Sequence, residues 1–205
     1  GVQASYVGKG SRILSFKASA KTENGGSIAV ENTDRDGRKN VVISTTDGGA
    51  LLRFLDIYDK MRGGSISIVL AENGDGVLGG EVDAKSFTIV GEPRLKSLVG
   101  TPVTRDGQSV PNAGKIDVSA VKFQRGTAQI QKGNGFLRLG EGILRSDQMG
   151  LSYDGTLYDQ DGRINMTGTF LPAYGLNRIF GEIPLIGEIL GNGRDKGLIG
   201  ITFKL

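Results

Sequence analysis

The sequence predicts a mainly β fold with short helices: a long, twisted antiparallel meander sheet that forms a groove or half-barrel and is packed by two helical inserts. Apolar and polar residues alternate along most of the chain, which is typical of half-buried strands. Glycine makes up 34 of the 205 residues, well above the usual share of about 7%. We therefore expect many turns between strands, and one domain over residues 1–205.

The alternation gives each predicted strand one apolar face. Near the start of the chain, Leu14 and Phe16 face one side of such a strand. Ser15 and Lys17 face the other side. In residues 115–124 the apolar phase slips, which predicts a bulge or a change of strand direction. The clearest alternating segments are residues 12–20, 65–70, 151–157 and 164–170.

Turn signals join these segments into a meander. Each turn has an Asn-Gly or Asp-Gly pair, which supplies the positive φ that tight hairpins require. Two turns, 32–37 and 159–162, also resemble the opening of a calcium loop. The twelfth loop position would be Ile43 or Phe170 rather than the required glutamate, so hairpins are favoured and we expect no metal. The pairs are Asn24-Gly25, Asp36-Gly37, Asp75-Gly76, Asn134-Gly135 and Asp161-Gly162.

Two inserts interrupt the meander with helical patterns. Asp47 is a suitable N-cap for a helix over 48–61, whose apolar stripe includes Leu51, Leu55 and Tyr58. Gly63-Gly64 is expected to end this helix. The second insert, residues 174–190, is apolar on both sides and is split at Pro184, so it must be covered by another surface. Its apolar residues include Ile183, Leu185, Ile186, Ile189 and Leu190.

A shorter helix is predicted between the two inserts. Pro93 is favourable in the first turn of a helix over 93–99. A polar loop with glycine and proline follows at 100–114, and we expect this loop to be the most mobile part of the chain.

Composition excludes several classes of function. The net charge of +3 comes from 25 basic and 22 acidic residues, which predicts no nucleic-acid partner. The chain has no cysteine and no histidine, so the common nucleophile and base pairs are missing. Most candidate carboxylates stand in turns, and we expect neither an enzyme nor a cofactor. No apolar stretch reaches the roughly 20 residues that a membrane helix needs.

The apolar strand faces support two interpretations. They either bury one another in an ordinary core, or form an open trough for acyl chains. Small residues on these faces would leave room for a ligand, or permit close helix packing: Ala18, Ala20, Ala29, Gly155 and Gly168. The candidate groove residues are Leu14, Phe16, Ile66, Ile68, Tyr153, Met166 and Phe170.

Two glycine-marked segments resemble a known family. The first comprises DGGALLRFL at 47–55 and YDKMRGG at 58–64. The second comprises GTFLPAYGLN at 168–177, IPLIGEIL at 183–190 and GLIG at 197–200. In order and spacing they resemble the AsmA-like C-terminal domain of bacterial envelope proteins. The resemblance covers about residues 10–205, although 93–133 matches only in pattern.

The resemblance implies a protein of the AsmA and YhdP group of bridge-like lipid transfer proteins. Such a protein is anchored in the inner membrane by an N-terminal helix and extends through the periplasm of a Gram-negative bacterium, where its β-sheet groove conducts phospholipid toward the outer membrane. The chain lacks that anchor and stops at Leu205, so we expect an excised domain. No catalytic residues come with the family.

Two functions follow as expectations. The first is a non-enzymatic periplasmic module for phospholipid or another acyl-chain ligand, taking part in phospholipid transport or outer-membrane homeostasis. The alternative is a structural or assembly module that docks on an outer-membrane or periplasmic protein. In either case the cap or docking residues would be Leu51, Leu55, Tyr58, Ile183, Pro184, Leu185, Ile186, Ile189 and Leu190.

Overall fold

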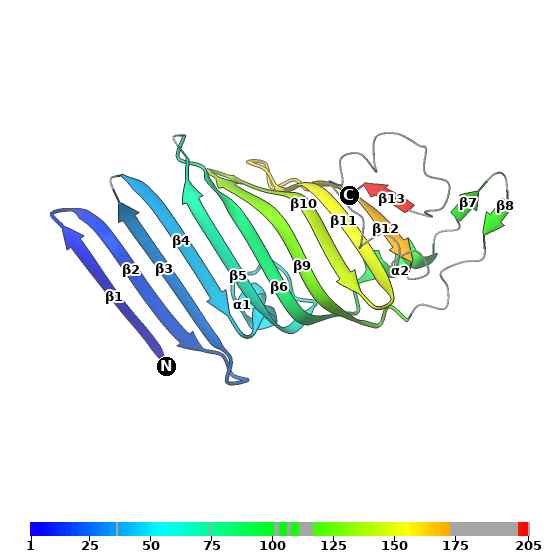
Figure 1. Ribbon diagram of the computed structural model, residues 1–205, viewed down its shortest axis with the longest axis horizontal. Helices are drawn as coiled ribbons and strands as arrows, with labels where there is room; N and C mark the ends of the chain where they lie inside the picture. Colours follow the sequence, from blue (N-terminus) through cyan, green and yellow to red (C-terminus); the bar gives the residue numbers. More distant parts are fainter. Residues whose placement is uncertain are drawn as a thin grey trace.

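The computed structural model describes residues 1–35, 37–73, 75–100, 103–105, 108–110, 117–172 and 201–204. Within these residues, eleven strands form one antiparallel sheet in the order β1-β2-β3-β4-β5-β6-β9-β10-β11-β12-β13 (Figure 1). The predicted mainly β meander is confirmed. The strands are β1 (Val2–Lys9), β2 (Arg12–Lys21), β3 (Ser27–Arg35), β4 (Arg38–Thr45), β5 (Met61–Glu72), β6 (Leu78–Val90), β9 (Ala120–Gly133), β10 (Phe136–Ser146), β11 (Met149–Tyr158), β12 (Asn165–Pro172) and β13 (Ile201–Lys204).

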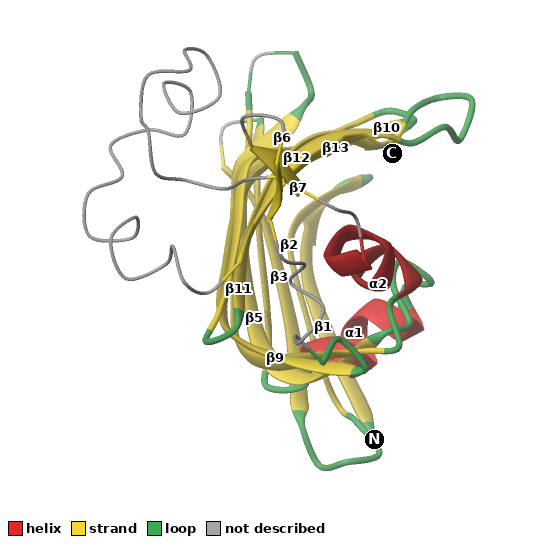
Figure 2. Ribbon diagram, turned by 90° about the vertical axis from the view of Figure 1, so that its right-hand side faces the viewer, coloured by secondary structure: helices red, strands yellow, loops and turns green. Residues whose placement is uncertain are grey.

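The other described elements are two short strands and two helices, which are not part of this sheet. Two three-residue strands, β7 (Val103–Arg105) and β8 (Gln108–Val110), pair with each other. The helices are α1 (Gly48–Phe54) and α2 (Pro93–Gly100). Figure 2 shows both helices on the concave side of the curved, open sheet. The described sheet is not closed into a barrel, because β1 and β13 form its two edges.

All five predicted hairpin turns are present. Their glycines have φ between 73° and 82°, the left-handed conformation that favours glycine. They connect β2 to β3, β3 to β4, β5 to β6, β9 to β10, and β11 to β12. Local turn chemistry therefore determines which strands are neighbours over most of the sheet. The glycines are Gly25, Gly37, Gly76, Gly135 and Gly162.

Helix α1 begins as predicted but is shorter. Asp47 is its N-cap and accepts a hydrogen bond from the Ala50 amide at 3.0 Å. The helix ends at Phe54 rather than at residue 61, and the chain turns at Asp56, whose φ is 53°. Met61 instead starts strand β5, where its side chain is packed in the core and only 4% exposed. Gly63-Gly64 lies inside β5, so the prediction that it ends a helix is wrong.

The other helical predictions have different outcomes. Helix α2 (Pro93–Gly100) confirms the predicted helix at 93–99. The predicted loop at 100–114 contains the antiparallel strands β7 and β8. Positions 101, 102, 106, 107 and 111–114 of this loop lie outside the described residues. The insert at 174–190 also lies outside them. The phase slip in 115–124 coincides with the start of β9 at Ala120.

The alternation shifts by one residue at the same level in two adjacent strands, β6 and β9. In β6, both Ala84 and Phe87 pack in the core although they are three residues apart. In β9 the corresponding pair is Phe123 and Gly126; an added side chain at Gly126 would meet the Phe87 ring. Ser86, in the β6 interval, has a φ of 53°. Extra residues of this kind bend strands, which accounts for part of the curvature.

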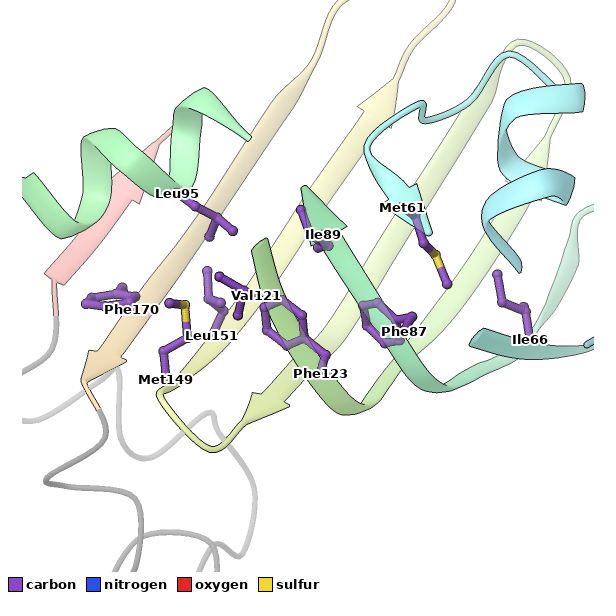
Figure 3. Packing of buried hydrophobic residues seen from close by; sticks show 10 residues of the cluster. All are labelled: Met61, Ile66, Phe87, Ile89, Leu95, Val121, Phe123, Met149, Leu151 and Phe170. Atoms are coloured by element: carbon purple, nitrogen blue, oxygen red, sulfur yellow. The ribbon is translucent and has the colours of Figure 1, made fainter. Parts of the chain in front are cut away.

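The hydrophobic core is a band that crosses strands β5 to β12 near one end of each strand, beneath the helices (Figure 3). The Phe87 and Phe123 rings stack with centroids 5.3 Å apart. Met149 and Phe170 are 0% exposed, and Leu95 joins them from α2. The cluster comprises Met61, Ile66, Phe87, Ile89, Leu95, Val121, Phe123, Met149, Leu151 and Phe170.

We predict that Asp47→Ala lowers the free energy of unfolding by about 1–2 kcal/mol, measured by urea denaturation. Asp47 is 6% exposed, and its second carboxylate oxygen also accepts from Thr22 and Asn24, each at 3.4 Å. The control is Asp75→Ala in an exposed turn, for which we expect a change within about 0.5 kcal/mol. Equal effects of the two variants would contradict the cap's importance.

We also predict that Gly49→Ala destabilises the protein by about 1–3 kcal/mol, although alanine is the better helix former. A Cβ at Gly49 would lie 2.5 Å from the carbonyl oxygen of Met61, because α1 rests directly on β5. Gly79→Ala is the matched control, since an added Cβ there meets nothing within 4 Å. Thermal melts of both variants test this, and a Gly49→Ala protein as stable as the parent would refute the close contact.

Candidate functional site

The two faces of the sheet differ in chemistry. Lys17 and Glu31 form an ion pair on the convex face, and Asp83 pairs there with both Lys85 and Arg125. On the opposite, concave face, most residues in the middle of strands β2 to β12 are apolar or small. We call this surface the concave apolar face, and it is the candidate functional site.

Strand register arranges the concave apolar face into three cross-sheet rows. Paired residues in neighbouring strands lie side by side, so each row follows the long axis of the sheet. The first row is Ala20, Ile28, Thr45, Ile66, Ala84, Gly126, Leu144, Leu151 and Phe170. The second is Ala18, Val30, Ile43, Ile68, Val82, Ala128, Gly142, Tyr153 and Gly168, passing a bulge in β10. The third is Phe16, Asn32, Val41, Leu70, Gly80, Ile130, Leu139, Gly155 and Met166.

The two helices cover only the end of this face that holds the first row. A Cβ added at Gly48 in α1 would meet the side chain of Ile66. Leu95 of α2 packs in the same cluster as Phe170. Several second- and third-row side chains remain partly exposed: Phe16, Val30, Val41, Ile43, Ile68, Val82, Ile130 and Leu139. The described part of the chain therefore leaves these two rows incompletely covered.

The seven predicted groove residues all lie on the concave apolar face or in line with it, but in different settings. Leu14, Phe16, Ile68 and Tyr153 are partly exposed. Met166, at the end of the third row, is only 6% exposed, so this candidate groove residue is buried.

Ile66 and Phe170 require a correction, because both belong to the packed core, at 4% and 0% exposure. The helices lie over their row, which no strand pattern indicates. Ala29 also requires a correction. It is exposed on the convex side, opposite Ser19 and Ser44.

Sequence reasoning missed several residues of the two open rows. Val30, Ile43 and Val41 lie on β3 and β4, whose alternation is present in the sequence but is interrupted by polar Asn32. Ile130 and Leu139 are neighbours across β9 and β10. Their shared face depends on the bulge in β10, so period-two counting alone would not have found it.

The predicted cap residues of the first insert form one edge of the site. Leu51 is buried at 4% exposure, whereas Leu55 is 47% exposed. Tyr58 packs against the core and donates a hydrogen bond to Glu92 Oε2 at 2.7 Å, which ties the α1–β5 connection to the start of α2. Burial is the main cause that raises the pKa of Tyr58 above its usual range, and the hydrogen bond to Glu92 raises it further. The remaining cap residues, Ile183, Pro184, Leu185, Ile186, Ile189 and Leu190, lie outside the described residues.

The turns that resembled calcium loops are held by other contacts. The Asp34 carboxylate accepts hydrogen bonds from two side-chain nitrogens of Arg12, at 2.7–2.9 Å. Asp159 Oδ1 accepts the backbone amides of Asp161 and Arg163, both at 2.9 Å, as a hairpin turn requires. Among the described residues, no cluster of acidic side chains could hold a metal ion. No helix in the same part of the chain is long and apolar enough to span a bilayer.

Comparison of the chain with protein-family models, with curated proteins and with solved structures finds no match.

The ion pairs of the convex face predict a pH dependence of stability. Partial burial raises the pKa of Asp83, but hydrogen bonds and charges from Arg125 and Lys85 outweigh it, so the net pKa lies below the usual range. A carboxylate with a depressed pKa stabilises the fold at neutral pH, and this contribution is lost as the pH falls through the folded-state pKa.

We therefore expect Asp83→Asn to lower the urea midpoint at pH 7. The gap from the parent protein should close progressively below about pH 4, where the carboxyl becomes protonated. Arg125→Gln should show the same trend, because it removes the opposite charge. A gap that stays constant between about pH 7 and pH 3 would contradict the assignment.

Proposed function

We propose that this protein is a non-enzymatic lipid-handling module whose concave apolar face binds acyl chains. The observation that carries the proposal is the pair of incompletely covered rows, which run without a charged residue from β2 to β12. A contiguous apolar surface of this kind is unusual on a domain with no ligand or partner.

The dimensions of the rows suit an extended hydrocarbon chain. Nine neighbouring strands spaced about 4.8 Å apart give each row a length of about 38 Å. Each methylene group that leaves water contributes about 0.8 kcal/mol. A chain lying along the rows would contact one apolar side chain per strand, so binding accumulates over many weak contacts and requires no fixed chemistry at any one residue.

The polar convex face suits an aqueous compartment. Together with the sequence resemblance to AsmA-like domains, it supports a periplasmic location in a protein anchored to the inner membrane, and a role in phospholipid transport or outer-membrane homeostasis. In this proposal the ligand is a phospholipid, and no nucleic acid is involved.

One observation favours a second candidate, a structural or assembly module that docks on an envelope protein. Edge strand β1 carries exposed apolar residues: Val2 at 77%, Tyr6 at 72% and Val7 at 59%. Ile13 on β2 is 57% exposed beside them. Edge strands normally carry charges or proline that prevent pairing, and β1 has only Lys9, at its end.

The lipid proposal is tested with a pair of variants on β4. Ile43 is partly exposed in the second row, between Val30 and Ile68, whereas Val42 points to the convex face and is 40% exposed. We predict that Ile43→Asp weakens binding of a fluorescent phospholipid at least roughly tenfold, because an unpaired carboxylate in apolar contact costs well over about 1.4 kcal/mol.

Val42→Asp is the matched control and should bind like the parent protein. Both variants are first checked for parental circular dichroism, and native mass spectrometry of the parent should detect bound phospholipid. A parent protein that binds no lipid, or a folded Ile43→Asp variant with parental affinity, would refute the proposal and favour the docking module.

A further inference from the structure

Tyr153 is the tyrosine within the second row of the concave apolar face. Its cross-strand neighbours are Gly142 on β10 and Gly168 on β12. The ring lies directly over Gly142, because any Cβ added there would collide with the ring carbons, including the one that bears the hydroxyl. The absence of a side chain at position 142 therefore lets the ring lie over the backbone of β10.

The Tyr153 hydroxyl has no hydrogen-bond partner among the described residues. Desolvation by the surrounding apolar surface is what raises the pKa of this phenol to about 12. Tyrosines in apolar surroundings usually have a hydrogen-bond partner for the hydroxyl. The side chain is only partly buried, so a ligand on the open rows can reach it.

The chemistry around Tyr153 limits what kind of acceptor fits. The three rows contain no lysine or arginine, and the lysines of the same face, Lys39 and Lys132, lie beyond the third row, on the side away from the second row and Tyr153. Moving an ion onto such a surface is costly. The other amide or hydroxyl side chain of the two open rows, Asn32, lies on β3, six strands from Tyr153 on β11. A neutral acceptor attached to a long hydrocarbon chain is therefore the group that suits Tyr153.

We propose that the Tyr153 hydroxyl donates a hydrogen bond to the ester carbonyl oxygen of an acyl lipid whose chain lies along the second and third rows. This inference rests on the proposed lipid-binding function and adds the class of ligand, a carboxylic ester, and the place where the ester lies. Tyr153 thereby fixes the position of a ligand that the apolar rows alone would leave free to slide.

The test compares Tyr153→Phe with the parent protein, using methyl dodecanoate and tridecane to displace the fluorescent apolar reporter 1-N-phenylnaphthylamine. Phenylalanine keeps the ring on Gly142 and removes only the hydroxyl. We expect the variant to bind methyl dodecanoate about three- to tenfold more weakly, the value of one neutral hydrogen bond, and to bind tridecane as the parent does. Tyr158→Phe, at the end of β11 where Lys132 lies over the ring, is the control and should change neither affinity.

The outcomes separate this inference from the proposed function. A parent protein that binds neither probe refutes both. If the parent binds tridecane and the ester, and Tyr153→Phe leaves both affinities unchanged, the ester contact is refuted while the apolar site stands. If a Tyr153→Phe variant with parental circular dichroism and melting temperature loses affinity for both probes equally, the hydroxyl supports the apolar site as a whole rather than an ester, and the ester contact is again refuted.

Discussion

A curved sheet with one apolar face must have that face covered, and the rest of this structure depends on how little of it the described helices cover. Helices α1 and α2 have only seven and eight residues. Each lies at the end of the sheet where the large core side chains gather, and α1 approaches so closely that Gly48 and Gly49 leave no room for a side chain. The core is therefore concentrated at one end, and apolar rows continue beyond it.

This arrangement reconciles two interpretations that looked exclusive. Within the described residues, a closed core and an incompletely covered apolar surface are both present, in different rows of the same face. Ile66 belongs to the core because α1 lies on it, while Ile68, two residues further along β5, is only partly buried by the described helices and strands. Two residues along a strand, a distance of about 7 Å, separate a side chain of the packed core from one that stays partly exposed among the described residues.

Much of the fold was predictable because its signals are local. Each Asn-Gly or Asp-Gly pair determines a hairpin through the φ of one glycine, and Asp47 caps α1 through a contact three residues away. The end of α1 was not predictable in the same way. Leu55 and Tyr58 continue a helical stripe, but the core needs Met61 at the start of a strand, and that tertiary requirement overrides local pattern.

The sequence by itself determined the antiparallel meander, its turns and the division of each strand into an apolar and a polar side, because these follow from neighbouring residues and a period of two. Only the tertiary structure decided which apolar residues are core and which stay accessible. That distinction depends on where α1 and α2 lie and on bulges that shift the alternation in β6, β9 and β10. Tyr153 illustrates both: its face was readable from β11 alone, whereas the support beneath its ring comes from Gly142 on another strand, brought there by register.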